Sequence, residues 1–410
     1  MKVHVLGLAH SPISRESVRD AFSIKAFNLC RMLRAHGHHV TLYGCAGSDA
    51  SIADEFVEVV SQADYEACYG QVDKVTYQFD SGSGWAGDDE AWRKFALATA
   101  YELDRRIGKD APEIICATLA WAQKSALDKL PRKAIVVESG IGYSPTTFAD
   151  RVFESDCWRA TILAQESKDR ASPGKRDVVI PNAFDADWFE YREKKGDYFL
   201  FLARVNPSKG VTFALDACRE AGVKLKVVGQ LPHGDAGKTA LAEIQDKGAE
   251  YLPSVGLDGR KELLAGARAL LSPTVYVEPF GGVTVEAGFS GTPVIATAWG
   301  AFPEIIEHGV TGWLCHSRDD MVEAIRRIDE IQPAACRSRV MARYTLDRVG
   351  RMYDYHLRRV VALSGGPKCP VDLDWMRPSP DPSTGLPSHG DIPSGLCSRT
   401  VQADCPTSCR

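Results

Sequence analysis

Two glutamates stand on either side of a glycine pair. Glu278 follows a predicted strand, 272–277, and Glu286 lies on the first turn of a predicted helix, 283–290. The glycine pair 281–282 predicts a loop tight enough for a ligand to touch the backbone. The first turn of a helix has free N–H groups and the positive end of the helix dipole, so it can hold a phosphate. The pattern predicts a sugar-nucleotide site, with carboxylates for hydroxyl groups and a helix end for phosphate.

Two cations are predicted to reach the same place from an earlier strand. Arg204 follows the apolar run 198–203, and Lys209 lies in a Pro/Ser turn before a helix that begins near Val211. Departure of a nucleoside diphosphate leaves negative charge on the β-phosphate, and fixed cations aimed there lower the barrier. We therefore predict that Arg204 and Lys209 hold the diphosphate.

The order of these motifs resembles that of retaining glycosyltransferases with the two-domain GT-B fold. The two glutamates match the E-x7-E motif of that group, and the similarity is greatest to glycosyltransferase family 4. Three flanking segments follow in the order of that family: GTPVI at 291–295, GAFPE at 300–304 and GVTGW at 309–313.

The resemblance implies a role for each motif residue. Glu286 would bind the nucleotide ribose, and Glu278 would face the donor sugar, with Glu278, Arg204 and Lys209 carrying the chemistry. Backbone groups of four residues would also face the donor: Phe280, Gly281, Gly282 and Val283. Two loops that end neighbouring strands, containing Gln230 and Val255, would hold the nucleobase.

The resemblance also implies the reaction. It is a retaining, metal-independent transfer of a hexose from a nucleoside diphosphate sugar, with UDP-sugar favoured, to an acceptor hydroxyl, and it needs no cofactor. The acceptor stays open among a glycan, a small molecule and, less favoured, a modified nucleic acid. Two alternatives also stay open: a sugar-nucleotide epimerase or phosphorylase on the same fold, and a non-catalytic protein that binds sugar or nucleic acid. Asp185 and Asp187 have the spacing of a metal motif but follow the inter-domain segment, so no metal site is predicted.

The N-terminal part departs from better-known family members. The glycine pair after the first strand is replaced by a segment that offers His10, Ser11 and Ser14 as possible donor contacts. No histidine follows the fourth core strand. Glu138 ends a strand and is a candidate to orient the acceptor or sugar, with capping of the following turn as the alternative. For Glu154, a catalytic role or an ion pair with Arg151 or Arg159 stays open.

Short apolar strands alternate with amphipathic helices, which predicts an α/β protein with two Rossmann-like domains whose parallel sheets face each other across a cleft. Strands are expected at 3–6, 40–43, 57–60, 114–116, 134–138, 159–163 and 178–180, then at 198–203, 224–228, 251–253, 269–272, 294–296 and 313–315. Long helices are expected at 18–36, 88–107 and 345–363. The predicted divisions are an acceptor-side domain 1–190, a donor-binding domain 191–345, a helix 346–364 that crosses back, and a disordered Pro/Gly/Ser-rich tail 365–410.

Composition agrees with a soluble enzyme. The chain has 410 residues, 44% hydrophobic and 25% charged, which favours more than one domain. The net charge of -5 gives no general attraction to nucleic acid or anionic membrane. The first residues are expected to form a buried strand instead of a signal sequence, and no apolar run is long enough to span a bilayer. The 12 cysteines show no pairing rhythm, so we expect a reduced, cytoplasmic protein.

Overall fold

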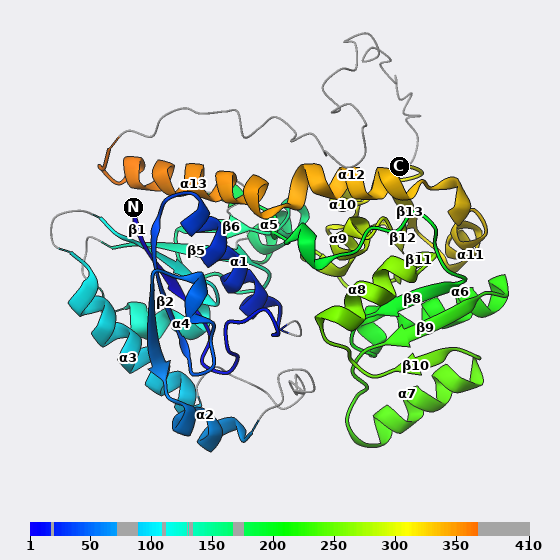
Figure 1. The fold of residues 1–410 in the computed structure, drawn as a ribbon, viewed down its shortest axis with the longest axis horizontal. Coiled ribbons are helices and arrows are strands. Elements are labelled where there is room, and N and C mark those ends of the chain that lie inside the picture. Colours follow the sequence, from blue (N-terminus) through cyan, green and yellow to red (C-terminus); the bar gives the residue numbers. More distant parts are fainter. Residues whose placement is uncertain are drawn as a thin grey trace, which may run out of the picture.

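The computed structural model describes residues 1–17, 20–71, 89–108, 112–128, 130, 134–166 and 176–367. Within them, two parallel β-sheets lie side by side, each flanked by helices (Figure 1). The predicted α/β architecture with two parallel sheets is confirmed. The first two residues of the helix expected at 18–36, residue 88 of the next one, and the tail from 368 onward lie outside the described residues.

The N-terminal sheet has the strand order β3-β2-β1-β4-β5-β6-β7. Its strands are β1 Lys2–Leu6, β2 His39–Cys45, β3 Glu55–Val60, β4 Ile114–Ala117, β5 Ile135–Ile141, β6 Asp150–Phe153 and β7 Val178–Val179. Its helices are α1 Ala21–Ala35, α2 Gln62–Tyr69, α3 Glu90–Arg106, α4 Ala120–Leu127 and α5 Asp156–Glu166, with a 3-10 turn η1 at Ala50–Ile52. The central strands are apolar because helices cover both faces of the sheet; Val3, Val5 and Leu6 of β1 are fully buried.

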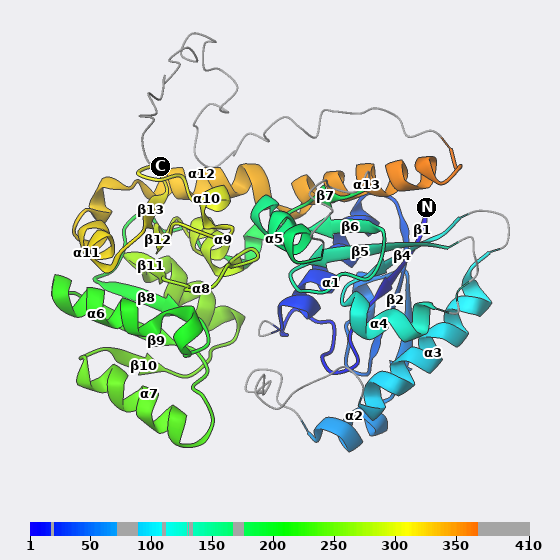
Figure 2. The same cartoon turned by 180° about the vertical axis from the view of Figure 1, so that it is seen from behind.

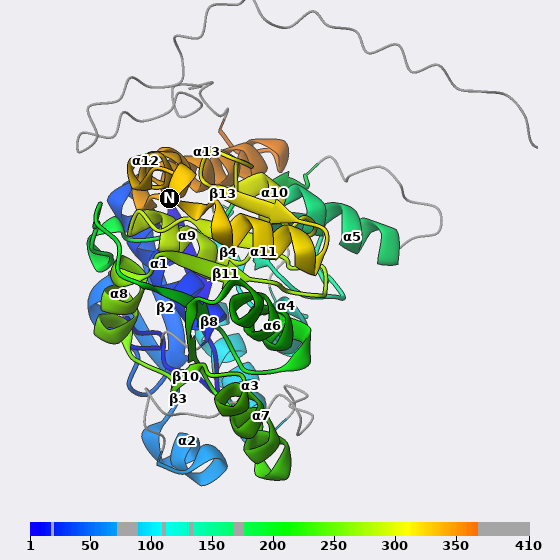
Figure 3. The same cartoon turned by 90° about the vertical axis from the view of Figure 1, so that its right-hand side faces the viewer.

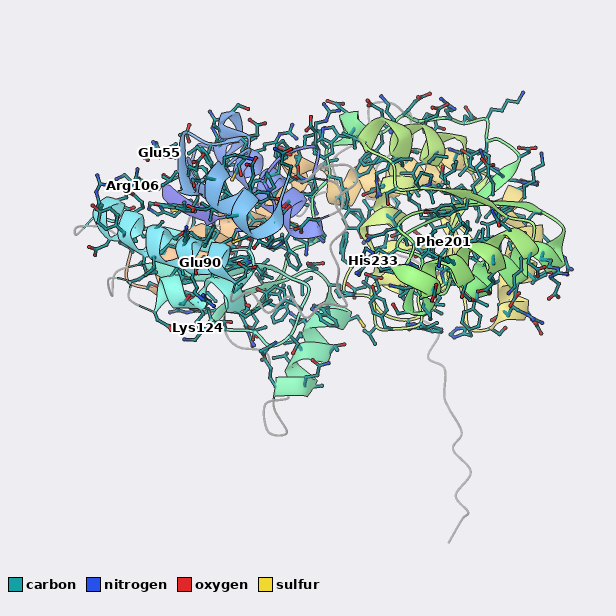
Figure 4. All side chains as sticks on the ribbon, turned by 90° about the horizontal axis from the view of Figure 1, so that it is seen from below. Glu55, Glu90, Arg106, Lys124, Phe201 and His233 are labelled. Carbon is teal, nitrogen blue, oxygen red and sulfur yellow. The ribbon has the colours of Figure 1, made fainter. Side chains whose placement is uncertain are left out.

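An ion pair fixes α3 against the edge of this sheet. Arg106, in the last turn of α3, donates to Glu55 Oε1 of β3 from Nε at 2.9 Å and from Nη2 at 2.7 Å (Figure 4). A cation near a helix carboxyl end is also favoured by the helix dipole. The pair helps to set the position of α3 beside β3.

The C-terminal sheet has the order β10-β9-β8-β11-β12-β13. Its strands are β8 Tyr198–Leu202, β9 Lys224–Val228, β10 Glu250–Leu252, β11 Ala269–Ser272, β12 Val294–Thr297 and β13 Gly312–Cys315. The helices are α6 Val211–Ala221, α7 Gly234–Asp246, α8 Leu257–Gly266, α9 Gly282–Phe289, α10 Phe302–Ile305, α11 Arg318–Arg326, α12 Pro333–Tyr344 and α13 Leu346–Leu363, with 3-10 turns η2 Ala186–Trp188, η3 Pro207–Lys209 and η4 Ile328–Glu330. Figure 3 shows α6 and α7 on one side of this sheet and α8 on the other.

Two expected strands are wrong. Residues 159–163 belong to α5, and the strand of this region is β6, which precedes it. The β-branched Thr161 and Ile162 favoured a strand, but the segment buries one helical side with Ile162 and Leu163. The strand expected at 272–277 is absent. β11 ends at Ser272, because Pro273 has no N–H to continue the ladder. Glu278 therefore lies on a loop, several residues beyond the strand end.

The last two helices run along one side of both domains (Figures 1 and 2). α12 packs on α9 of the C-terminal domain, whereas α13 packs on α1 of the N-terminal domain. His38, just after α1, contacts Asp354 of α13 with 2.8 Å between Nε2 and Oδ1. The final helix therefore joins the two domains.

His356 on α13 should make stability depend on pH. Its side chain is 2% exposed, and burial, together with the charge of Arg359, lowers its pKa to about 4. Between pH 6.5 and about 4, the unfolded chain binds more protons than the folded one. The free energy of unfolding should therefore decrease by about 3 kcal/mol as the pH is lowered through this window. Denaturant unfolding at pH 7.5 and 4.5 measures this loss. The variant His356→Leu should lose about 2 to 3 kcal/mol less than the wild type. Equal losses would show that another group is responsible.

Candidate active site

Loops at the carboxyl ends of β8 and β11 meet in the C-terminal domain. The β11–α9 loop, residues 273–281, is tied to its neighbours through the backbone: Val275 N donates to Ser208 O at 3.0 Å, and Ala301 N donates to Glu278 O at 3.0 Å. Ligands of open parallel sheets bind at this edge. The structure therefore brings together the two segments in which the sequence places its chemistry.

The loop ends at a glycine for which no other residue fits. Gly281 has φ 82°, and a Cβ there would lie 2.6 Å from Phe302 Cε1. Gly281 directly precedes α9, whose first turn has no side-chain cap. Thr284 N donates to Gly281 O at 2.9 Å, so the N–H groups of Gly282 and Val283 are the ones available to a ligand. The helix starts at Gly282, which puts Glu286 in the second turn instead of the first.

Lys209 and Glu278, predicted for phosphate and sugar respectively, are bound to each other. Lys209 Nζ lies 2.6 Å from Glu278 Oε2, and both side chains are mostly buried. Tyr276 OH donates to the same carboxylate oxygen at 2.8 Å and also contacts Lys209 Nζ. The cation and the carboxylate thus neutralise each other.

Arg204 lies within electrostatic reach of this cluster. Burial raises the pKa of the Tyr276 phenol above its ordinary value, Glu278 acts the same way, and the charge of Arg204 acts in the opposite direction. Lys209 and Glu278 are thus in direct contact, and the charge of Arg204 acts on the same cluster. Their contact with a donor stays a prediction.

Glu286 has a partner that the sequence analysis missed. Arg260, in the first half of α8, forms an ion pair with Glu286 Oε2 through Nη2. Both side chains are mostly buried. A cation near a helix N-terminus is disfavoured by the helix dipole. The position of Arg260 near the start of α8 therefore indicates that it pairs with a negative charge elsewhere.

The two predicted nucleobase residues lie in adjacent loops. Gln230 follows β9, and its carbonyl accepts a hydrogen bond from Val205 N at 2.8 Å. Val255 lies between β10 and α8, against Gly259. Both loops stand at the carboxyl edge of the sheet, and the Gln230 loop lies beside the Arg204 segment.

The predicted donor contacts of the N-terminal domain are buried and already bonded. His10 Nε2 lies 3.0 Å from Asp20 Oδ2, and Ser11 accepts from Ser23 Oγ at 2.7 Å. Ser14 Oγ lies 3.2 Å from Ser17 Oγ. These contacts tie the loop after β1 to the start of α1. They describe a structural role for His10, Ser11 and Ser14, and contact of these residues with a donor stays a prediction.

Glu138 also has a structural position. It is fully buried and accepts three hydrogen bonds, from Thr147 N at 2.8 Å, Phe148 N at 3.0 Å and Tyr143 OH at 3.0 Å. Burial raises the pKa of its carboxyl group, and these hydrogen bonds act in the opposite direction. The capping alternative thus describes the contacts of Glu138, since its carboxylate is bonded to its own turn, and its catalytic role stays a prediction.

Glu154 pairs with neither of the arginines considered for it. Its partners are Lys25 of α1, in an ion pair, and Asn182, whose Nδ2 donates to Oε2 at 3.0 Å. Arg151 instead binds Asp177 at 2.6 Å, and Arg159 binds Asp156 at 2.7 Å. Burial lowers the pKa of Lys25, while the charges of Asp20 and Glu278 act against this. The charge of Glu278, in the other domain, thus acts on Lys25, a residue that the sequence analysis does not identify.

The described residues also bear on the Asp-x-Asp segment, on membrane-spanning helices and on the cysteines. Asp185 of the Asp-x-Asp segment pairs with Arg31 at 2.8 Å and caps η2. In the described part of the chain, no helix is long and apolar enough to cross a membrane. The eight cysteines that the structure describes are free thiols.

Comparison with known proteins gives a family domain in the C-terminal part of the chain and relatives that match about a third of it. Residues 196–330 match the model of the family "Glycosyl transferases group 1". D-inositol 3-phosphate glycosyltransferase of Mycolicibacterium paratuberculosis is 31% identical over 168 residues, which are 36% of this chain and 37% of the relative. Phosphatidyl-myo-inositol mannosyltransferase of Mycobacterium tuberculosis is 32% identical over 154 residues, 34% of this chain and 40% of the relative. The chain thus matches less than half the length of these relatives.

Solved structures are similar over nearly the whole chain. Sucrose-phosphate synthase of Thermosynechococcus elongatus has a TM-score of 0.65 at 16% identity, covering 88% of this chain and 100% of its own. HepE of Anabaena, in complex with UDP and glucose, has a TM-score of 0.61 at 17% identity, covering 87% and 99%. AviGT4, a glycosyltransferase involved in avilamycin A biosynthesis, has a TM-score of 0.62 at 20% identity, covering 88% and 98%. These likenesses confirm the predicted GT-B fold.

Proposed function

Because this chain has the GT-B fold and carries a glycosyl transferases group 1 domain that resembles glycosyltransferase family 4, we propose that it is a retaining, metal-independent glycosyltransferase. It would move a sugar from a nucleoside diphosphate sugar to an acceptor hydroxyl. A UDP-sugar is the favoured donor, since HepE of Anabaena, a protein of the same fold, binds UDP and UDP-glucose.

The contact between Lys209 and Glu278 carries the proposal. It joins the cation of the β8–α6 turn to the first glutamate of the E-x7-E pattern at 2.6 Å. Lys209 therefore stands where a phosphate can replace a carboxylate, and Glu278 stands where sugar hydroxyls can replace an ammonium. Donor binding would exchange one internal ion pair for two contacts with the ligand.

The chemistry follows from these positions. The acceptor oxygen forms a bond to the anomeric carbon while the bond from that carbon to the β-phosphate oxygen breaks. The acceptor proton passes to the departing phosphate, so no nucleophile from the chain is required. Lys209, Arg204 and the first turn of α9 would stabilise the negative charge that grows on the phosphate.

A panel of UDP-glucose, GDP-mannose, ADP-glucose and dTDP-glucose tests the donor assignment. A ligand at 100 times its Kd adds about 2.7 kcal/mol to apparent stability, which a thermal-shift measurement detects. We expect one of the four to stabilise the protein and then to yield free nucleoside diphosphate with a glycosylated or hydrolysed product. An epimerised sugar nucleotide or a sugar phosphate as the main product would contradict transfer.

A further inference from the structure

Residues 154–157, which follow β6 and include the first two residues of α5, connect the two domains, and we call them the inter-domain clamp. Figure 2 shows α5 at the boundary between the domains. Ser155 Oγ donates to Pro279 O of the β11–α9 loop at 2.7 Å, although the two residues are 124 positions apart in the chain. A segment of the N-terminal domain thus holds the loop that carries Glu278.

The clamp is fixed at the start of α5 by a residue of the other domain. Asp156 N donates to Glu304 Oε2 at 3.0 Å, and Cys157 N donates to Glu304 Oε1 at 2.8 Å. Ser155 Oγ also accepts from Trp158 N at 3.0 Å. The first N–H groups of α5 are thus satisfied by Glu304 of α10 and by Ser155, and a carboxylate at a helix N-terminus is favoured by the helix dipole.

The other end of the clamp is held within the N-terminal domain. Glu154 pairs with Lys25 of α1 and accepts from Asn182 Nδ2 at 3.0 Å, and Lys25 Nζ also donates to Gly140 O at 3.3 Å. Glu154 is 4% exposed and Ser155 is 2% exposed. Ser155 therefore stands on a rigid support, because its neighbours on both sides are bonded.

Hydrogen bonds from both domains fix the course of the β11–α9 loop. Those at Val275 N and Glu278 O come from its own domain, and the one at Pro279 O comes from Ser155. Pro279 lies between Glu278 and Phe280, whose ring is buried against Phe184. The carbonyl of Pro279 belongs to the peptide between Pro279 and Phe280, one peptide beyond Glu278. Because the proline ring fixes φ, the orientation of this peptide is linked to that of the peptide that follows Glu278, so the bond to Ser155 restrains the backbone that directs the Glu278 side chain.

We propose that Ser155 is a positioning residue for the transfer reaction: from the N-terminal domain it orients Glu278 toward the donor sugar. This inference rests on the proposed glycosyltransferase function. The hydroxyl of Ser155 takes no part in bond making or breaking. Through this bond, the orientation of Glu278 toward the sugar depends on the distance between the two domains. The nucleotide, in contrast, is held by residues of the C-terminal domain alone.

The variant Ser155→Ala tests this separation. With the most stabilising sugar nucleotide of the four-member panel, kcat should fall about tenfold, as expected for the loss of one buried hydrogen bond. Calorimetry with UDP, or with the diphosphate of the donor that the panel identifies, should give a Kd within about twofold of wild type. Ser155→Thr keeps the hydroxyl and should restore most of kcat. Ser290→Ala is the matched control, because Ser290 is also buried but its hydroxyl has no hydrogen-bond partner among the described residues.

The outcomes separate the inference from the proposed function. An active wild type with an unchanged kcat in Ser155→Ala would overturn the positioning role and leave the glycosyltransferase standing. Equal losses of kcat and of nucleotide affinity would also overturn it, since they would show a general structural defect. A wild type that yields no nucleoside diphosphate from any of the four donors would overturn the proposed function and the inference with it.

Discussion

Replacing Lys209 by alanine is expected to lower kcat/KM for the donor by about 10²–10³ while the protein stays folded. The phosphate would lose a fixed cation at the point where negative charge grows in the transition state. Lys209 is partly exposed, at 19% of its side-chain surface, so truncation leaves no closed cavity. Arg204→Ala should behave similarly, because its charge reaches the same cluster. Initial rates over a range of donor concentrations measure the effect.

Lys238→Ala serves as the control for the loss of a lysine. Its side chain is 81% exposed on α7 and pairs with Asp235 at the surface, so its rates should equal those of the wild type. Melting curves of each variant show whether the fold survives. Wild-type kcat/KM in Lys209→Ala would contradict the phosphate assignment.

Replacing each of the two glutamates by glutamine should affect different properties of the enzyme, nucleotide affinity for Glu286 and turnover for Glu278. Glu286→Gln should weaken binding of the bare nucleoside diphosphate by about 1.5–3 kcal/mol, the worth of a hydrogen bond to a charged group. Glu278→Gln should reduce turnover yet leave nucleotide affinity unchanged or higher, because it releases Lys209 from their ion pair for the phosphate.

Arg260 extends this prediction. Arg260→Met removes the partner that holds Glu286, so it should weaken nucleotide binding in the same direction as Glu286→Gln, with little change in kcat at saturating donor. Calorimetry with UDP, or with the diphosphate of the donor that the panel identifies, and initial rates on the three variants give the comparison. Equal losses of nucleotide affinity in Glu278→Gln and Glu286→Gln would contradict the division of labour between them.

Local patterns in the sequence were sufficient for most strands and for the loops that carry the site. The alternation of apolar runs predicts β8, β9, β11 and β12 to within about a residue, since buried parallel strands have few alternatives. Residues 159–163, expected as a strand, form part of α5. β-Branched residues occur in both strands and helices, and tertiary packing decides between the two. The further strand expected at 272–277 is absent, because Pro273 has no N–H to continue the ladder beyond β11.

Partners distant in sequence could not be predicted. The sequence predicts separate ligand groups for Glu278 and Lys209. Nothing in the sequence indicates that these two residues, 69 positions apart, bind each other. Glu154 finds Lys25 across 129 positions, while the arginines near it in sequence are bonded elsewhere. Glu138 depends on the direction of two backbone N–H groups in the following turn, which residue types alone do not specify.

The configuration of the first sugar product tests the central claim most directly. UDP-glucose, or the donor that the thermal-shift panel identifies, is incubated with the protein, and proton NMR follows the anomeric signals from the start of the reaction. Retaining transfer from an α-linked donor predicts a nucleoside diphosphate and a product that first appears as the α-anomer, whether water or an added acceptor receives the sugar. A β-anomer as the first product, or a sugar phosphate in place of the nucleoside diphosphate, would contradict the account.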